Sequence, residues 1–402
     1  MNKETFIIDG IRTPIGNFGG SLSAIRADDL AALVIRELLQ RNLWLPKGNI
    51  DDVILGCHNQ AGEDNRNVAR MALLLAGLPV TVPGETINRL CSSGMSALIH
   101  AHRAAMAGDG DLFIAGGVEH MTRAPLVVSK PSKAFGTDSK LEDSSFGWRF
   151  INPKMHTLYG TEPMGMTAEN LVDLYDISRE DQDKFALSSQ KKASKARNNG
   201  RLSEEIMRIE IPQRRKDSLI FEEDEFIKPF SDLETLGTLR PAFKKNGTIT
   251  AGNASGLNDG AAVVLMASGE AVAKYSLQPM AKIISSAVVG VEPRLMGIGP
   301  VAATEKALKK AGLTLEDIGV IEVNEAFAAQ VLACTRALGL ADDDERVNRN
   351  GGAIALGHPL GMSGTRITYT AALELQKTNR KYALATMCVG VGQGYAVILE
   401  RV

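Results

Sequence analysis

An internal repeat of the hydrophobic pattern constrains the fold of this 402-residue chain more than any other feature. Short apolar stretches alternate with segments of helical periodicity, which is typical of an α/β protein. In the first half, an expected helix over 28–40, with Asp28 or Asp29 as its N-cap, is followed by a strand over 50–56. In the second half, a helix over 302–311 is followed by a strand over 319–324. The same order of elements therefore occurs twice.

Two pairs of matching residues are separated by nearly the same number of positions in the sequence. Ile54 and Ile321 lie 267 residues apart, and Asn88 and Asn348 lie 260 apart. Each Asn follows Ile or Val and precedes Arg, a glycine-containing turn, a helix and a strand. Any α/β chain offers chance matches between helices and strands. The repeated Ile/Val-Asn-Arg phrase nevertheless favours an internal duplication.

The region between the halves has a different composition. Residues 121–249 are polar and rich in methionine and charged residues, and Ser178 predicts the N-cap of a long helix there. Loops on a rigid scaffold often carry binding, so we expect an inserted loop domain that binds the substrate. The expected organisation is an N-terminal half over 1–120 (completed by about 250–270), the insert over 121–249, and a C-terminal half over 271–402.

Composition excludes several classes of function. The chain has 45 basic and 47 acidic residues, and a net charge of −2 gives no electrostatic reason to expect nucleic acid or a membrane as partner. No apolar run approaches the ~18 residues of a spanning helix, and we expect no secretory signal. Four cysteines are too few for a disulfide framework. We expect a soluble, cytoplasmic protein.

Several common motifs are absent from the sequence. It contains no GxxxxGK[ST], HExxH, GxSxG or CxxC. The histidines and cysteines lack the spacing of metal ligands, so we expect no metal and no permanently bound cofactor. The glycine-rich run 390–394 lies too near the C-terminus for a dinucleotide-binding βαβ unit.

Cys91 is the most informative residue. It opens an expected helix and is surrounded by small residues, in the run CSSG at 91–94. A helix N-terminus favours the thiolate, so we expect a lowered pKa for Cys91. Small neighbours leave backbone N–H groups free to bind an oxyanion. A buried core cysteine is the competing interpretation, and the local sequence does not decide between them.

Three further residues are candidates for catalysis. His358 lies in a glycine-dense loop, where it can act as a general base or be an ordinary turn histidine. Cys388 ends an expected strand and can serve as an acid or base, or pack in the core. Asn324 ends another strand, where its amide can hold a water or a carbonyl. The other two cysteines, Cys57 and Cys334, lie in apolar surroundings and are expected in the core.

Taken together, these segments resemble the thiolase family. The motifs are NRLCSSG at 88–94, NEAF at 324–327, GHP at 357–359 and CVG at 388–390. The similarity begins at Ile11 and reaches the C-terminus. Thiolases have two similar five-stranded halves packed as an αβαβα sandwich with an inserted loop domain, so the resemblance implies this fold.

The resemblance also implies catalytic roles. Cys91 would be the nucleophile that takes the acyl group, His358 would activate it, and Cys388 would move the proton at the α-carbon. His358 and a water held by Asn324 would bind the thioester oxygen, and the N–H groups of Cys91 and Gly390 would form a second oxyanion hole. Cleavage of a 3-oxoacyl thioester expels an enolate, which needs these groups. An acyl-cysteine intermediate predicts ping-pong kinetics.

Coenzyme A is the substrate partner that the resemblance implies. The segment 250–257 matches the family's pantetheine-contacting segment, with Ser255 as the direct contact. The other positions that match the CoA and substrate tunnel are Met164, Phe243, Ala254, Leu257, Met296 and Phe327. Lys228 falls where many relatives place an arginine near the nucleotide. Pro163 replaces a histidine found in many biosynthetic relatives, which argues against acetoacetyl-CoA as the substrate.

Within the family, the segments 60–70 and 142–153 are most similar to thiolases that cleave 3-oxoadipyl-CoA in aromatic-compound degradation. We therefore predict thiolysis of 3-oxoadipyl-CoA to succinyl-CoA and acetyl-CoA. This substrate ends in a carboxylate, for which Arg66 and Arg149 are candidate partners unless both form structural ion pairs. The alternative is an acetyl-CoA acetyltransferase or general 3-ketoacyl-CoA thiolase that acts on acetoacetyl-CoA.

Two other classes fit less well. A non-catalytic acyl-CoA carrier would have lost a catalytic position, and all four are present. A decarboxylating enzyme that uses acyl-carrier protein would pair its cysteine with two histidines or with histidine and asparagine, so Cys388 argues against it. Because family members are mostly dimers and tetramers, we expect a homotetramer built as a dimer of dimers.

Overall fold

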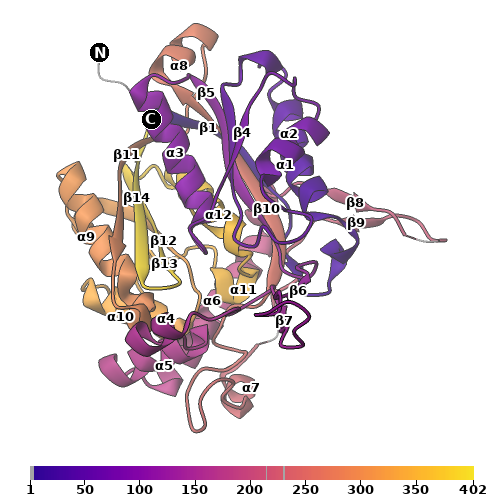
Figure 1. Ribbon diagram of the computed structural model, residues 1–402. Coiled ribbons are helices and arrows are strands. Elements are labelled where there is room, and N and C mark those ends of the chain that lie inside the picture. Colours follow the sequence, from indigo (N-terminus) through magenta and orange to yellow (C-terminus); the bar gives the residue numbers. More distant parts are fainter. Residues whose placement is uncertain (1–3, 214, 230) are drawn as a thin grey trace.

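The computed structural model describes residues 4–402 apart from 214 and 230, and its largest feature is one ten-stranded sheet. The strands of this sheet are β1 (Thr5–Arg12), β2 (Gly16–Asn17), β3 (Asp52–Gly56), β4 (Gly84–Ile87), β5 (Leu112–His120), β10 (Asn258–Ser268), β11 (Ala281–Gly290), β12 (Ile318–Val323), β13 (Tyr382–Val389) and β14 (Gln393–Arg401). Their order is β4-β3-β5-β10-β1-β11-β14-β13-β12, with β2 paired to β10 (Figure 1).

The arrangement of strands is the same over four strands when followed outward from the centre in either direction, and β4 extends the first half by one more strand. At the centre, β1 and β11 pair antiparallel through Phe6 with Lys282 and Ile7 with Ala281. Outward from them lie the antiparallel partners β10 and β14, then β5 and β13, then β3 and β12. The pairs β3·β5 and β12·β13 are both parallel. This symmetry confirms the expected duplication.

The helices form three layers, one on the outer face of each half of the sheet and one between the two halves. They are α1 (Ala27–Arg41), α2 (Val68–Leu75), α3 (Ser93–Ala107), α8 (Gly269–Tyr275), α9 (Gly299–Ala311), α10 (Ala328–Ala337), α11 (Ala353–Leu356) and α12 (Leu360–Thr378). The helices α1 and α2 pack on the outer face of the first half, and α9 and α10 pack on that of the second (Figure 1). Between the halves lie α3 and α12, which contact each other and both sets of strands. The layers are therefore αβαβα, as predicted.

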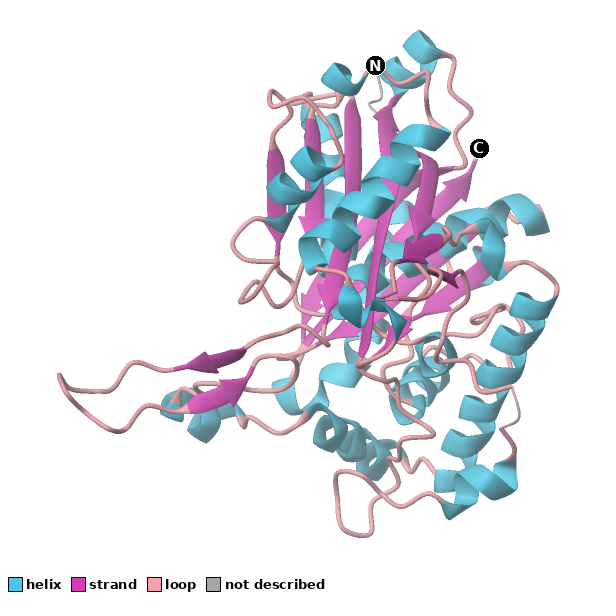
Figure 2. Ribbon diagram, turned by 90° about the vertical axis from the view of Figure 1, so that its right-hand side faces the viewer, coloured by secondary structure: helices cyan, strands magenta, loops and turns pink. Residues whose placement is uncertain are grey.

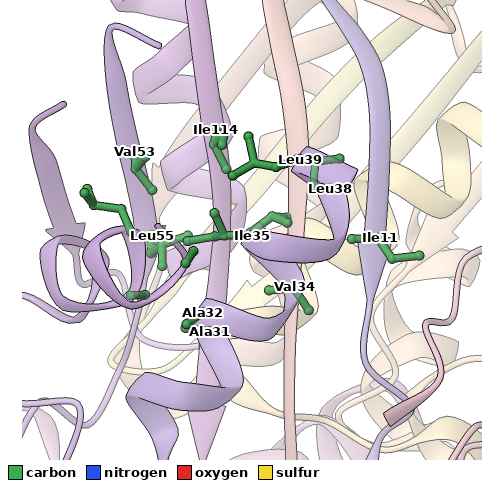
Figure 3. Close-up of a cluster of buried hydrophobic side chains, with 14 of the residues drawn as sticks. Ile11, Ala31, Ala32, Val34, Ile35, Leu38, Leu39, Val53, Leu55 and Ile114 are labelled. Atoms are coloured by element: carbon green, nitrogen blue, oxygen red, sulfur yellow. The ribbon is translucent and has the colours of Figure 1, made fainter. Parts of the chain in front are cut away.

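The sequence of α1 shows why the outer layer forms. Its apolar residues recur at three- and four-residue steps and lie on one face, toward the sheet (Figure 3). Val34, Ile35 and Leu38 are at most 1% exposed, and they belong to the same core cluster as Val53 and Ile114 of the strands. Full burial of each such side chain stabilises the fold by roughly 1.5–3 kcal/mol.

The N-terminus of α1 differs slightly from the expectation that Asp28 or Asp29 caps it. The N-cap is Arg26, which makes no capping side-chain hydrogen bond. Both aspartates lie inside the first turn, where the helix dipole favours negative charge. No helix in the described part of the chain has the length and apolarity that a membrane crossing requires.

The segment between β5 and β10 gathers at one end of the sheet (Figures 1 and 2). Its elements are the hairpins β6 (Leu126–Val128) with β7 (Leu141–Asp143) and β8 (Ile209–Ile211) with β9 (Leu219–Phe221), and the helices α4 (Pro153–Tyr159), α5 (Met164–Tyr175), α6 (Arg179–Asn198) and α7 (Leu233–Thr238). The Ser178 side chain accepts a hydrogen bond from Asp181 N at 3.0 Å, which confirms the expected cap of α6. The short 3-10 helices are η1 (Ser21–Ala24), η2 (Lys47–Asn49), η3 (Leu202–Glu204), η4 (Pro293–Ile298) and η5 (Leu315–Asp317).

A buried arginine ties this segment to the sheet. Arg12 on β1 is 0% exposed. Its Nε donates to Glu205 Oε1 at 2.8 Å, and Nη1 and Nη2 donate to the two carboxylate oxygens of Asp224 at 2.7 and 2.9 Å. Because a buried charge is tolerated only when paired, these contacts fix where the segment leaves and rejoins the sheet.

Arg12→Met is expected to lower the free energy of unfolding by about 3–5 kcal/mol, because it leaves buried carboxylates with fewer partners. The half-exposed Arg41, which pairs with Asp9 at 2.7 Å, provides the control. Arg41→Met is expected to cost at most about 1 kcal/mol. Urea unfolding followed by circular dichroism measures both values, and equal losses would contradict the anchoring role.

Candidate active site

Four residues from separate elements meet at one end of the sheet. Cys91 comes just before α3, His358 just before α12, Asn324 just after β12, and Cys388 near the end of β13. Cys91, His358 and Cys388 line one cavity of about 320 Å³. Asn324 contacts His358 directly, with its Nδ2 3.3 Å from His358 Nε2. The structure thus brings together the four side chains that the sequence singled out.

The loop before α3 holds Cys91 in a tight turn. Leu90 has a φ of 47°, a left-handed conformation that is uncommon for a residue other than glycine. Its N–H donates to Asn88 Oδ1 at 2.9 Å, and its carbonyl accepts the Ser93 hydroxyl at 2.6 Å. These short-range bonds keep the strained turn in place, and Cys91 therefore stays directed at the cavity.

Glycines let α3 and α12 approach each other beside Cys91 and His358. A Cβ on Gly94 would lie 2.6 Å from the Gly361 carbonyl oxygen, and one on Gly364 would lie 2.5 Å from Met95 N. No larger residue fits either position without moving a helix. The two helix N-termini, and the residues that precede them, are therefore held together by backbone contact.

The hydrogen bonds of His358 determine its tautomer. The Ser363 hydroxyl donates to the Pro359 carbonyl at 2.8 Å, so toward His358 Nδ1, 2.6 Å away, it can only accept. Nδ1 therefore carries the proton, and Nε2 has a lone pair that faces the Asn324 Nδ2–H group at 3.3 Å. Burial, helped by the charge of Arg366, lowers the pKa of His358 to about 3. At neutral pH the imidazole is uncharged, and Nε2 can accept a proton.

The pKa of Cys91 is opposite to the sequence-based expectation. Burial raises it to about 11, although the N–H groups of Gly390 and of Cys91 itself stabilise the thiolate. The helix α3 begins only at Ser93, with Ser92 as its N-cap, so Cys91 lies outside the first turn. Desolvation outweighs the local donors, and Cys91 is a neutral thiol at rest.

Cys388 and Asn324 complete the site. Burial raises the pKa of the Cys388 thiol well above its ordinary value, and the nearby Cys91 adds to the effect. Cys388 is therefore protonated at neutral pH and can donate a proton. Asn324 Oδ1 is buried and has no hydrogen-bond partner among the described residues. A buried amide oxygen of this kind suits a bound water.

Most of the expected substrate-binding residues line the same cavity as Cys91. They are Met164, Phe243, Ala254, Ser255, Leu257 and Phe327. The Phe243 ring meets the Phe327 ring edge-on, with centroids 6.2 Å apart. Met296 is buried in a core cluster with Met164 and Cys388. Lys228 is exposed, and its Nζ lies 4.6 Å from the centre of the Phe226 ring.

The two arginines considered for a substrate carboxylate lie elsewhere. Arg66 is exposed, with a φ of 60°, in the loop before α2. Arg149 is partly buried, and its Nη1 donates to the Ser144 carbonyl at 3.4 Å. Burial of His58 lowers its pKa to about 4, and the charge of Arg149 adds to this effect. Neither arginine is among the described residues that line the cavity.

Glu119 is a buried residue near the site that the sequence did not indicate. It accepts hydrogen bonds from the N–H groups of His58 at 2.9 Å, Gly361 at 2.8 Å and Asn59 at 3.1 Å. Burial raises its pKa to about 7. With Cys57 and Asp64 it forms a group whose ligand atoms lie within 4.8 Å, a geometry that could hold a metal ion. Because its oxygens already accept three backbone N–H groups, Glu119 fits better as a brace between β3 and α12.

Comparisons with known proteins agree with this site. Residues 5–270 match the model of the thiolase N-terminal domain, and 277–401 match that of the thiolase C-terminal domain. The 3-oxoadipyl-CoA/3-oxo-5,6-dehydrosuberyl-CoA thiolase of Escherichia coli is 58% identical over 100% of both chains, and a beta-ketoadipyl-CoA thiolase of Acinetobacter baylyi is 56% identical over the same extent. An acetyl-CoA acetyltransferase of Chromobacterium violaceum is 46% identical over 99% of this chain and 100% of its own.

Solved structures agree as well. The human mitochondrial 3-ketoacyl-CoA thiolase in complex with CoA is 41% identical, with a TM-score of 0.92, over 100% of this chain and 98% of its own. The chain belongs to the thiolase family. It is an acyltransferase, and the predicted family and fold class are confirmed.

Ser363→Ala is expected to lower kcat at least about tenfold with little change in KM, because His358 loses the acceptor that fixes its tautomer. Steady-state thiolysis assays measure both constants. Thr368→Val on the same helix is the control, since the Thr368 hydroxyl bonds only its own helix at Gly364 O. An unchanged kcat in Ser363→Ala would remove Ser363 from this role.

The raised pKa of Cys91 predicts how its alkylation depends on pH. Below the pKa the thiolate fraction grows about tenfold per pH unit, so the rate with iodoacetamide is expected to climb steadily from pH 7 to 9. Peptide mass spectrometry of the Cys91 peptide follows the reaction, with the buried Cys334 as an internal control. A plateau below pH 8 would show that Cys91 is a thiolate at rest.

Proposed function

We propose that this protein cleaves 3-oxoadipyl-CoA with CoA to succinyl-CoA and acetyl-CoA in aromatic-compound degradation. The supporting observation is that full-length relatives at 56–58% identity bear this activity in their names, whereas the acetyl-CoA acetyltransferase relative is 46% identical. The acyl-chain choice rests on this difference, because the thiolase chemistry is the same in both cases.

In the proposed first half-reaction, Cys91 attacks the C3 carbonyl while His358 Nε2 takes its proton. The C2–C3 bond breaks, and its electron pair forms the enolate of acetyl-CoA. Cys388 then donates a proton to C2, and acetyl-CoA leaves. In the second half-reaction, the Cys388 thiolate takes the proton of the CoA thiol, and the CoA sulfur attacks the carbonyl carbon of succinyl-Cys91. The bond between this carbon and the Cys91 sulfur breaks, His358 returns its proton to Cys91, and succinyl-CoA leaves.

Two sets of donors stabilise the charges that develop. Protonated His358, with a water held by Asn324, binds the thioester oxygen of the enolate. The N–H groups of Cys91 and Gly390, which already face the sulfur, bind the oxygen of the carbonyl under attack. Because the resting site contains no formal charge on Cys91 or His358, these donors act mainly on the transition state.

CoA is proposed to lie along the segment 121–249 and the loop 250–257. Ser255 would contact the pantetheine, and the apolar walls at Met164, Phe243 and Leu257 would enclose it. Lys228 would lie near the nucleotide, where its exposed ammonium can meet phosphate. The proposed division is a half over 1–120 completed by about 250–270, this insert, and a half over 271–402.

The protein is further proposed to be a cytoplasmic homotetramer. All four cysteines are free, which suits a reducing compartment. The β6–β7 hairpin exposes Leu126, Val128 and Leu141, each more than 60% accessible, and Phe135 lies exposed between its strands. An apolar surface of this kind favours burial between subunits.

The second candidate is an acetyl-CoA acetyltransferase or general 3-ketoacyl-CoA thiolase acting on acetoacetyl-CoA. One observation favours it, because the cavity around Cys91 is lined almost entirely by apolar side chains. A short, uncharged acyl group would fit these walls without a cation.

Thiolysis rates on the two substrates distinguish the candidates. At equal concentrations with free CoA, kcat/KM is expected to be at least about tenfold higher for 3-oxoadipyl-CoA than for acetoacetyl-CoA. In the absence of free CoA, 3-oxoadipyl-CoA is expected to leave a succinyl group on Cys91, detected by peptide mass spectrometry.

Each outcome of this experiment has a separate meaning. A preference for acetoacetyl-CoA would establish the second candidate. A succinyl group on Cys388 instead of Cys91 would reject the assigned nucleophile but not the substrate. Cys334→Ala, which alters a buried cysteine outside the cavity lining, serves as the matched control for the adduct.

A further inference from the structure

The proposed substrate raises a problem that the main cavity does not solve. 3-Oxoadipyl-CoA and the succinyl-enzyme both end in a carboxylate, and an unpaired carboxylate is costly in apolar surroundings. No lysine or arginine is among the described residues that line the cavity around Cys91, and His358 is neutral. The carboxylate therefore needs a partner outside this cavity but within reach of Cys91.

A second, smaller space adjoins the first. This side recess is lined by Trp148, Tyr159, Glu162, Met164, Arg294 and Val391. Its volume is about 20 Å³, enough for one water-sized group, so a carboxylate enters only when Met164 turns aside. Its lining comes from the end of α4, the start of α5, η4 and the turn between β13 and β14.

Met164 separates the side recess from the reaction centre, since it lines both spaces. A Cβ on Gly390 would lie 3.9 Å from both Sδ and Cε of Met164, and the N–H of Gly390 favours the thiolate form of Cys91. Because a methionine side chain is flexible, Met164 can turn aside for an acyl chain that extends from Cys91.

Arg294 is the cation in the side recess. Its Nη2 donates to Glu162 Oε1 at 2.5 Å, and the side chain is 56% exposed. Among the described residues, its Nε and Nη1 have no hydrogen-bond partner. A guanidinium offers five N–H donors in a planar fork that matches a carboxylate. Arg294 thus keeps donors available for a second carboxylate.

The neighbouring Glu162 does not exclude a substrate carboxylate. Its charge is compensated by Arg294, which lowers the pKa of Glu162. Its other oxygen accepts Asn170 Nδ2 at 3.0 Å, and the same amide also donates to the Arg294 carbonyl at 3.0 Å. These bonds hold Glu162 and the backbone of Arg294 in place, with the guanidinium at the wall of the side recess.

The turn that carries Gly390 is strained at the side recess. Val391 has a φ of 61°, a genuine outlier for a β-branched residue, and Gly392 follows with a φ of 78°. Strain of this kind persists where the surrounding structure needs a particular geometry, often at ligand sites. Here it places a partly exposed apolar side chain beside Arg294 and next to the oxyanion donor.

We propose that Arg294 binds the terminal carboxylate of the acyl chain in the side recess and so selects dicarboxylic over neutral 3-oxoacyl-CoA substrates. This inference rests on the proposed function, which supplies the carboxylate. Met164 turns aside, the chain passes between Gly390 and Met296, and Arg294 pairs with the carboxylate through its free donors. Arg294 is a specificity residue and takes no part in bond breaking.

Kinetics on two matched substrates test the inference. 3-Oxoadipyl-CoA is compared with 3-oxohexanoyl-CoA, which has the same number of acyl carbons and a methyl group in place of the carboxylate. Arg294→Gln is expected to lower kcat/KM for 3-oxoadipyl-CoA at least about 30-fold, mainly through KM, because the carboxylate loses its charge-assisted hydrogen bonds. For 3-oxohexanoyl-CoA the change is expected to stay within about twofold, which also shows that the variant is folded.

Further variants test whether Arg294 pairs with the substrate carboxylate or only offsets the negative charge of Glu162. Glu162→Gln is expected to keep the preference for 3-oxoadipyl-CoA, since the guanidinium remains. The double variant Arg294→Gln/Glu162→Gln removes the like charge of Glu162 and is still expected to lack the preference. If the double variant regains it, Arg294 acts only by neutralising Glu162 and the inference is wrong.

The outcomes also separate this inference from the proposed function. A wild-type enzyme that treats the two substrates alike would reject the function itself. A wild-type preference that survives in Arg294→Gln would leave the function standing and overturn the inference. Arg66→Gln and Arg149→Gln are measured in parallel, and loss of the preference in either one alone would place the carboxylate there instead.

Discussion

The chemistry of this protein depends on the backbone contact between α3 and α12. Glycines at Gly94 and Gly364 let the two helices touch, with no room for a Cβ at the contact. The duplicated halves place these helices in the middle layer, between the two sets of strands. Because Cys91 precedes one helix and His358 precedes the other, the contact sets how the proposed nucleophile and the proposed base face each other. Neither half alone contains both groups.

Burial keeps the Cys91 and His358 side chains uncharged before substrate binds. The same desolvation raises the pKa of Cys91 to about 11 and lowers that of His358 to about 3, so both side chains are neutral. In the proposed reaction, charge separates only when an acyl group arrives and the proton of Cys91 moves to His358 Nε2. The donors for that charge are backbone N–H groups and a side-chain amide fixed beforehand, which is where preorganised dipoles stabilise a transition state most. Burial therefore protects the thiol from side reactions while the donors recover its reactivity.

The sequence predicted the features that depend on short stretches of the chain. The repeat, the strands around Ile54 and Ile321, and the residue types at strand and helix ends all follow from periodicity and turn chemistry. The raised pKa of Cys91 does not follow from local pattern, because Cys91 is buried by segments hundreds of residues away in the sequence. Glu119 was missed for the same reason, since its bonds reach across 61 and 242 residues. Arg294 has no local motif, and only the fold places it beside Met164.

Different parts of the structure supply the reacting groups and the walls around the acyl chain. The two halves supply the thiols, the imidazole and the oxyanion donors, whereas Met164, Phe243 and Glu162 come from the segment between β5 and β10. That segment is held to the sheet by the buried Arg12, whose two carboxylate partners both belong to it. Changes on its inner surface can therefore alter which acyl chain fits without moving Cys91 or His358. In the proposed mechanism, substrate choice follows from the side chains around Met164, while the reaction follows from residues of the two duplicated halves.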